Sequence, residues 1–146
     1  MRRTSRSILS VLACGTLLVS ACGQAAVTAP EADGPAKVEP IDGTPLKRLT
    51  LTEEATQRLG IETVRVASGP GGRTTVPAAT VLYDASGLTW VYTNPQAHVF
   101  VRAEITVARI DGGVATLTSG PPTDTPVVTV GVAELYGTEL GVGDPE

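Results

Sequence analysis

Few residues in this chain are of types that do chemistry. There are two cysteines, Cys14 and Cys22, one histidine, His98, and one methionine, Met1. A soft or borderline metal such as zinc, copper or silver needs several thiolate, imidazole or thioether ligands, and this inventory supplies too few. We therefore expect no metal and no metal-dependent cofactor. His98 follows a predicted turn, where we interpret it as an exposed structural residue.

Cys22 has the most informative surroundings of these residues. It follows an apolar run from Ile8 to Val19, which itself follows Arg2, Arg3 and Arg6. A basic start, a short apolar segment and small residues before a possible cleavage point are typical of a secretory signal. The run is shorter than the roughly 20 residues of a membrane-spanning helix. Residues after the arginine pair do not follow the twin-arginine pattern, which favours the general secretory route.

The segment Leu18-Val-Ser-Ala-Cys22 resembles the lipobox of bacterial lipoproteins. This resemblance implies cleavage between Ala21 and Cys22, a diacylglycerol on the Cys22 thiol and an N-acyl chain such as palmitate on its amine. It predicts an extracytoplasmic protein that is anchored to the cell membrane through this lipid. The alternatives are an ordinary cysteine or a disulfide with Cys14, but such a bridge would lie within the signal segment rather than in a folded domain.

Other motifs do not predict catalysis. A nucleophile needs a neighbouring base and a group that orients it, and the chain has one histidine and no Gly-x-Ser-x-Gly segment. Glu53 and Glu54 are adjacent, as suits the start of a helix, where acidic side chains favour the dipole. The glycines within 69–72 lack the Lys-Ser/Thr of a phosphate-binding loop. We therefore predict that the protein is not an enzyme.

Cleavage before Cys22 would leave 125 residues. Three of the eleven basic residues precede that point and all fifteen acidic residues follow it, so the mature chain carries a net charge of −7. This acidity argues against nucleic-acid partners and against electrostatic attraction to anionic lipid. Membrane attachment is then expected to be covalent.

Three parts are predicted along the chain: a signal peptide at 1–21, a lipidated Pro-rich linker at 22–48 and a β domain at 49–146. Four prolines recur at five-residue intervals in the linker, at Pro30, Pro35, Pro40 and Pro45. Repeated proline favours a disordered, extended spacer, and about 23 such residues reach at most about 70 Å. A Pro-rich recognition peptide is the alternative, but the linker has no Pro-x-x-Pro spacing.

The remainder predicts a mainly β fold, a small antiparallel barrel or sandwich with one short N-terminal helix. Thr52 can cap that helix and Gly60 can end it. Short runs of β-branched and alternating residues separated by turn signals then predict strands at 61–66, 76–83, 88–93, 99–107, 114–118 and 126–130. Turns are expected at 84–87, 94–97 and 111–113, with Trp90, Tyr92 and Phe100 in an otherwise aliphatic core.

Five stretches resemble the periplasmic adaptor family, also called membrane fusion proteins, of tripartite efflux pumps. They are the entry segment Leu51–Val66, the strand Val76–Asp84, the pair Thr89–Tyr92 and Phe100–Val107, and a final stretch with Gly120, Val127–Gly131 and Glu134-Leu135. The resemblance covers roughly residues 50–141 and implies the barrel entry and the membrane-proximal domain.

The chain also departs from that family. Between Val66 and Thr75 there is no room for the lipoyl-like halves and the coiled-coil hairpin of such adaptors. The family's Gly-Leu-x-x-Gly-Asp turn is here Gly120-Pro-Pro-Thr-Asp-Thr. The resemblance implies a non-enzymatic docking module for a membrane transporter. The alternatives are a free-standing ligand-binding or envelope-associated lipoprotein and a structural β domain without a specific ligand.

Overall fold

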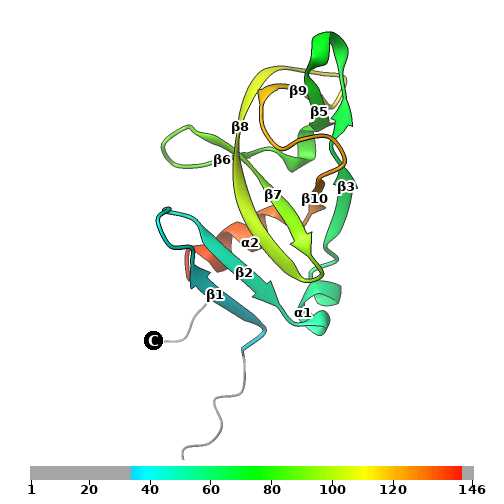
Figure 1. Ribbon diagram of the computed structural model, residues 1–146. Helices are drawn as coiled ribbons and strands as arrows, with labels where there is room; N and C mark the ends of the chain where they lie inside the picture. The colour runs from blue at the N-terminus through cyan, green and yellow to red at the C-terminus, as the bar shows by residue number, and fades with distance from the viewer. Residues whose placement is uncertain (1–33, 143–146) are drawn as a thin grey trace, which may run out of the picture. The chain divides into compact units, whose positions relative to one another are not determined.

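The computed structural model describes residues 34–142 of the chain (Figure 1). The predicted signal peptide, Cys22 and the first part of the predicted linker lie outside the described residues. Within them the fold is mainly β, an antiparallel and nearly closed barrel-like sheet accompanied by two α-helices. This confirms the predicted fold class.

The fold begins earlier than the sequence analysis placed it. Strand β1 (Ala36–Pro40) pairs antiparallel with β2 (Lys47–Leu51), so the second half of the predicted spacer is a hairpin. Between the strands the amide of Ile41 donates to the carbonyl of Leu46, and Gly43 has a φ of 76°. Proline is tolerated here because Pro40 ends an edge strand, where no neighbour needs its missing N–H.

Helix α1 (Glu53–Arg58) confirms the predicted helix and its cap. The hydroxyl of Thr52 accepts a hydrogen bond of 3.1 Å from the amide of Ala55, and both first-turn acids favour the dipole. Gly60 follows in the left-handed region, with a φ of 60°. The helix thus turns the chain from β2 into β3 (Glu62–Arg65), which was also predicted.

The barrel closes through one continuous segment. The sheet order is β3-β10-β7-β8-β9-β5-β4, whose two ends, β3 and β4 (Ala67–Ser68), are consecutive in the chain. Val66 lies between them, 1% exposed; its amide donates to the carbonyl of Thr125 and its carbonyl accepts from the amide of Asp124, each at 2.9 Å. The same segment therefore pairs with β10 through its first half and with β5 through its second. The other strands of this path are β5 (Thr74–Pro77), β7 (Thr89–Gln96), β8 (Val99–Asp111), β9 (Val114–Ser119) and β10 (Pro126–Val130).

The strand predicted over 76–83 is interrupted. It forms β5, a 3-10 turn over Ala78–Thr80 (η2) and the short strand β6 (Leu82–Tyr83), which pairs with β7. The Ala78 amide still donates to the carbonyl of Gly113 at 2.8 Å, and the 3-10 turn that follows is held by the hydroxyl of Thr80, which donates to the Pro77 carbonyl at 2.8 Å. The interruption carries the chain from β5, near one end of the sheet order, to β6, which pairs with β7.

The turn predicted at 94–97 begins later. Strand β7 continues through Gln96 with a register irregularity between Thr93 and Gln96, and His98, with a φ of 60°, occupies the turn. The Asn94 side-chain amide donates to the carbonyls of Gln96 and Val99, which holds this irregular end. The hairpin at Asp111–Gly113 is confirmed, with both glycines at positive φ.

Strand β7 separates two clusters of core residues. One contains Tyr92 and Phe100 together with Leu49, Leu51, Ala55, Val128 and Leu135. The other contains Val91, on the opposite face, together with Val66, Val76, Ile105, Ala115, Leu117 and Val127. Trp90, Tyr92 and Phe100 are buried as predicted. The two clusters cover the two faces of β7, while β10 and β8 pair with its two edges.

The sequence analysis did not predict helix α2 (Val132–Glu139). Gly131 precedes it with a φ of 93°, and the fully buried Leu135 packs into the first core cluster. Val132, one turn before Leu135, and Tyr136, the next residue after it, also pack against this cluster. The helix brings its last residue, Glu139, onto the barrel.

Candidate functional site

Residues singled out in the sequence have structural roles in the described part. The Nδ1 of His98 lies 3.0 Å from the hydroxyl of Thr56, which links the β7–β8 turn to α1. Glu53 accepts a hydrogen bond from Gln57 on the exposed side of the helix. The amide of Gly69 donates to the carbonyl of Arg73 within a β hairpin. In residues 34–142, no group of three or more His, Cys, Asp or Glu side chains could hold a metal ion.

A buried ionic cluster joins α2 to the barrel. Glu139 is 2% exposed, and the Nε of Arg102 lies 3.0 Å and 2.8 Å from its two carboxylate oxygens. The phenol of Tyr92, fully buried, donates to the same carboxylate at 2.5 Å. The Nζ of Lys47 donates to the Glu139 carbonyl at 2.8 Å. Strands β2, β7 and β8 thus all meet the end of α2.

Aromatic rings surround the cation of this cluster. The Arg102 guanidinium lies 4.6 Å from the ring centroid of Trp90 and 5.5 Å from that of Tyr136. A cation over the face of an aromatic ring is attracted by the ring quadrupole, so both contacts help to hold the guanidinium in place. Burial, together with the Glu139 carboxylate, raises the pKa of Tyr92 well above its usual value, because a second negative charge would be unpaired there. The phenol therefore remains a hydrogen-bond donor.

The cluster continues outward to the turn between β6 and β7. The Trp90 indole donates to Asp84 at 2.9 Å, and the other carboxylate oxygen of Asp84 accepts from the amides of Ser86 and Leu88. These bonds, that of Trp90 first, hold the pKa of Asp84 below its usual value, assisted by the positive charge of Arg102. A short path of contacts therefore connects this surface turn to Glu139.

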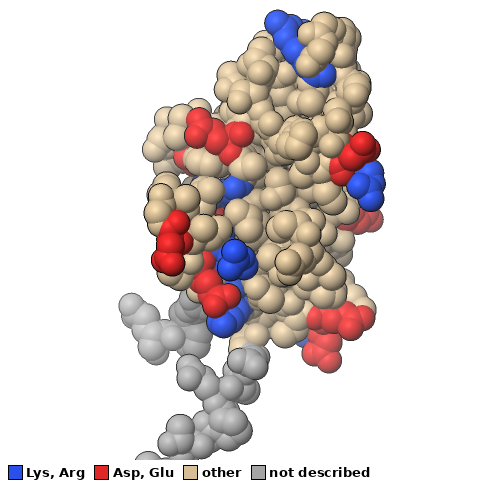
Figure 2. Space-filling view, viewed as in Figure 1, with Lys and Arg blue, Asp and Glu red and all other residues tan. Residues whose placement is uncertain are grey.

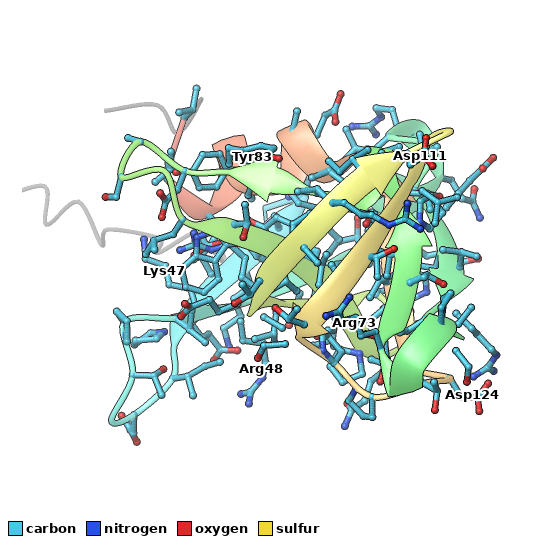
Figure 3. All side chains as sticks on the ribbon, turned by 90° about the horizontal axis from the view of Figure 1, so that it is seen from above. Lys47, Arg48, Arg73, Tyr83, Asp111 and Asp124 are labelled. Atoms are coloured by element: carbon cyan, nitrogen blue, oxygen red, sulfur yellow. The ribbon has the colours of Figure 1, made fainter. Side chains whose placement is uncertain are left out.

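The turn presents apolar side chains to solvent. Tyr83 is 58% exposed and Leu88 is 47% exposed, at either end of a segment whose backbone is fixed by Asp84. We call Tyr83–Leu88 the β6–β7 turn. Figure 3 places Tyr83 on the same side of the molecule as Lys47, away from Asp111 and Asp124. A preorganised aromatic and aliphatic pair is chemically suited to contact with another protein, because little ordering entropy is lost.

Sequence reasoning did not identify Glu139 or Arg102 as partners. They are 37 positions apart and lie on a helix and a strand whose packing no local pattern reveals. Asp84 had a local signal, since aspartate at the start of a turn commonly accepts hydrogen bonds from amides two to four residues later. That signal would have indicated the fixed backbone of the β6–β7 turn, although not its indole partner.

No family model, no curated protein and no solved structure matches the chain. Within residues 34–142, neither helix has the length and apolar character needed to cross a membrane.

Proposed function

We propose that the protein is a lipid-anchored, extracytoplasmic, adaptor-like protein that binds a membrane transporter through its β domain and has no enzymatic activity. The anchor is the lipid on Cys22 that the lipobox-like segment predicts. The β domain binds the transporter and catalyses no reaction. Three lines of support follow from the sequence and the described residues.

The observation that carries the proposal is the arrangement of the adaptor-like stretches. Val76–Asp84 forms β5 and β6, Thr89–Tyr92 lies on β7, and Phe100–Val107 lies on β8. The final stretch forms β10 and the start of α2. In the sheet β10, β7 and β8 are adjacent, β6 pairs with β7, and β9 separates β8 from β5, so the strands formed by these stretches belong to one sheet. A resemblance scattered over unrelated elements would carry much less weight.

The described polar groups support a binding role. Every buried side-chain nitrogen or oxygen in residues 34–142 has a hydrogen-bond partner. The cluster around Glu139 is saturated by Arg102 and Tyr92, so it holds elements together. Groups engaged in this way position a surface and do not attack a substrate.

The exposed surface suits a protein partner. Figure 2 shows a face on which charged side chains are separated by wide uncharged areas. Tyr83 and Leu88 give the β6–β7 turn a rigid apolar contact, and tyrosine is among the residues that contribute most to protein interfaces. We assign the β6–β7 turn as the contact with the transporter.

Site-specific crosslinking tests this assignment. A photo-crosslinking amino acid would replace Tyr83 in the full chain, in the membranes of the producing bacterium, followed by mass spectrometry. The matched control carries the same group at Arg73, which is exposed in the loop before β5. We expect a transporter subunit with the probe at 83 and not at 73. Failure to recover any transporter subunit from either position would overturn the proposal.

A separate experiment tests the anchor. Cells grown with a radioactive fatty acid would label the wild-type chain, and Cys22→Ala would abolish the label. An unlabelled wild-type chain would remove the basis for the localisation. The two experiments fail independently, because a soluble adaptor could still bind its transporter.

The alternative of a ligand-binding lipoprotein requires a hollow of suitable size. An apolar hollow of about 180 Å³ lies between α1 and β1, lined by residues that include Ala36, Leu51 and Leu59. Pockets for small-molecule ligands usually have about 300–1,000 Å³. This hollow is smaller than that range, whereas a second hollow of about 480 Å³, lined by Arg48, Thr50, Pro95, Gln96, Val99 and Val101, falls within it. The preference for the adaptor role therefore rests on the adaptor-like stretches and not on hollow size.

A further inference from the structure

Strand β1 is an edge strand with a free side. Among the described residues it pairs only with β2. The Thr52 amide donates to the Pro35 carbonyl, and the Ile41 amide donates to the Leu46 carbonyl, at the two ends of this ladder. Because hydrogen-bonded positions alternate in an antiparallel pair, Lys37 and Glu39 bond to β2. The backbone groups of Ala36, Val38 and Pro40 then point away from β2.

The sequence of β1 is complementary to itself. In an antiparallel pairing centred on Val38, Lys37 of one copy faces Glu39 of the other, and the reverse pair is identical. Within one chain the two side chains already share a face, with Nζ and Oε1 2.9 Å apart. Opposite charges directly across a strand pair stabilise it, whereas like charges destabilise it.

Apolar groups line the same edge. Val38 is 36% exposed and Leu140 is 58% exposed. Both line a hollow of about 290 Å³ beside β1, together with Pro40, Lys47 and the end of α2. Figure 1 shows this end of α2 behind the β1–β2 hairpin. A second strand laid along β1 would cover Val38 and approach this apolar rim.

We propose that β1 pairs with β1 of a second copy of this chain, antiparallel and with a two-fold axis at Val38. The pairing forms four backbone hydrogen bonds: two between the Val38 residues, and one from each Ala36 amide to the Pro40 carbonyl of the other copy. Pro40 has no N–H, so the ladder ends there. A C2 contact of this kind uses the same patch on both copies and leaves no free side on β1.

A second copy fits this edge better than an unrelated peptide does. An arbitrary extended peptide could form the backbone bonds, but only this chain is certain to bring a lysine and a glutamate in the matching order. Five-residue strands bury less than the 1,200–2,000 Å² of a stable interface, so we expect weak association in solution. If the proposed anchor is present, confinement to a membrane raises the effective concentration and the dimer population.

Disulfide trapping tests the pairing and its register. In the full chain with Cys14→Ala and Cys22→Ala, in mild detergent, Val38→Cys is oxidised with a mild oxidant. Directly opposed hydrogen-bonded residues have Cα atoms about 5.5 Å apart, within the range for a disulfide. We expect a covalent dimer. Lys37→Cys is the matched control, since those two Cα atoms would be about 8 Å apart, beyond that range. A mixture of Lys37→Cys and Glu39→Cys chains should give the mixed dimer.

Charge reversal adds a test that does not depend on disulfides. Lys37→Glu places four acidic side chains across the axis and should reduce trapping at position 38 severalfold, whereas Lys37→Glu with Glu39→Lys should restore it. Equal trapping of Val38→Cys and Lys37→Cys, or no rescue by the double reversal, would overturn the pairing. Crosslinking of Val38→Cys in membranes to a different protein alone would also overturn it. The trapping experiment in detergent uses chains without Cys22. It therefore tests the β1 pairing even if the proposed lipid anchor is wrong.

Discussion

The phenol of Tyr92 and the carboxylate of Glu139 share a hydrogen bond of 2.5 Å across 47 positions of sequence. The bond joins the central strand of the barrel to the last turn of α2. Arg102, 13% exposed at its side chain, balances the carboxylate from the neighbouring strand. The C-terminal helix is thus fixed to the barrel by a buried polar contact as well as by Leu135 and its apolar neighbours.

Removing the carboxylate charge should destabilise the fold. Glu139→Gln leaves the Arg102 cation buried without its partner, and breaking a buried pair in this way costs about 3–5 kcal/mol. Urea denaturation should show this loss in the free energy of unfolding. Glu104→Gln, at an exposed position two residues along β8, is the matched control and should change stability by less than about 0.5 kcal/mol. Similar values for the two variants would contradict the role of the cluster.

Stability should fall in alkaline solution because the pKa of Tyr92 is raised in the folded protein from its usual value of 10.0. Below pH 10 the phenol is protonated in both states, and its contribution is fully present. Above pH 10 only the unfolded state releases the proton, so stability decreases as pH rises, by about 1.4 kcal/mol per pH unit. Urea denaturation between pH 8 and about pH 11 would measure this slope. The Tyr92→Phe variant should show a smaller slope. An unchanged slope in that variant would show that another group causes the loss of stability.

The glycine before α2 should not tolerate a side chain. Gly131 has a φ of 93°, and an added Cβ would lie 2.9 Å from the Cγ1 of Ile61. Gly131→Ala combines backbone strain with this close contact, and we expect a loss of about 2–4 kcal/mol in thermal or urea denaturation.

Gly71→Ala separates the two causes. Gly71 also has a positive φ, 68°, but nothing lies within 4 Å of an added Cβ. It should therefore show the strain alone, about 1–2 kcal/mol. Equal losses at the two positions would mean that the contact with Ile61 contributes nothing.

The backbone of the β6–β7 turn should depend on Asp84. Asp84→Ala removes the acceptor of the Ser86 and Leu88 amides and of the Trp90 indole. We expect faster hydrogen exchange at the Leu88 amide and weaker crosslinking from position 83. Asp111→Ala, on a hairpin where that side chain is 79% exposed, should affect neither. Normal crosslinking from Asp84→Ala would show that the turn need not be rigid to bind.

The Asp84 carboxylate should also make the order of the β6–β7 turn depend on pH in acid. The pKa of Asp84 is lowered from 3.8, chiefly by the Trp90 hydrogen bond. Its contribution is therefore present above pH 3.8 and is lost as the pH falls through the lower, folded-state pKa. Exchange at Leu88 should accelerate in this acidic range relative to a distant amide such as Leu117, after correction for the intrinsic rates.

The sequence determined those elements whose signals are local. Thr52 and Gly60 bound α1, Gly112 and Gly113 form a hairpin turn, and the alternating residues of 99–107 predict most of β8. Each depends on the φ preference of a residue, on a side chain within four positions or on a period of two. The mainly β class follows from these signals together.

Only the tertiary structure decided where the chain closes and what α2 contacts. From the sequence alone Pro40 is interpreted as a spacer residue, whereas in the structure it pairs with β2. Val66 closes the barrel through hydrogen bonds to residues nearly 60 positions away. Glu139 reads as an ordinary helical acid until Tyr92 and Arg102 surround it. Such pairings depend on which faces bury apolar area together over the whole sheet, and no local preference encodes that choice.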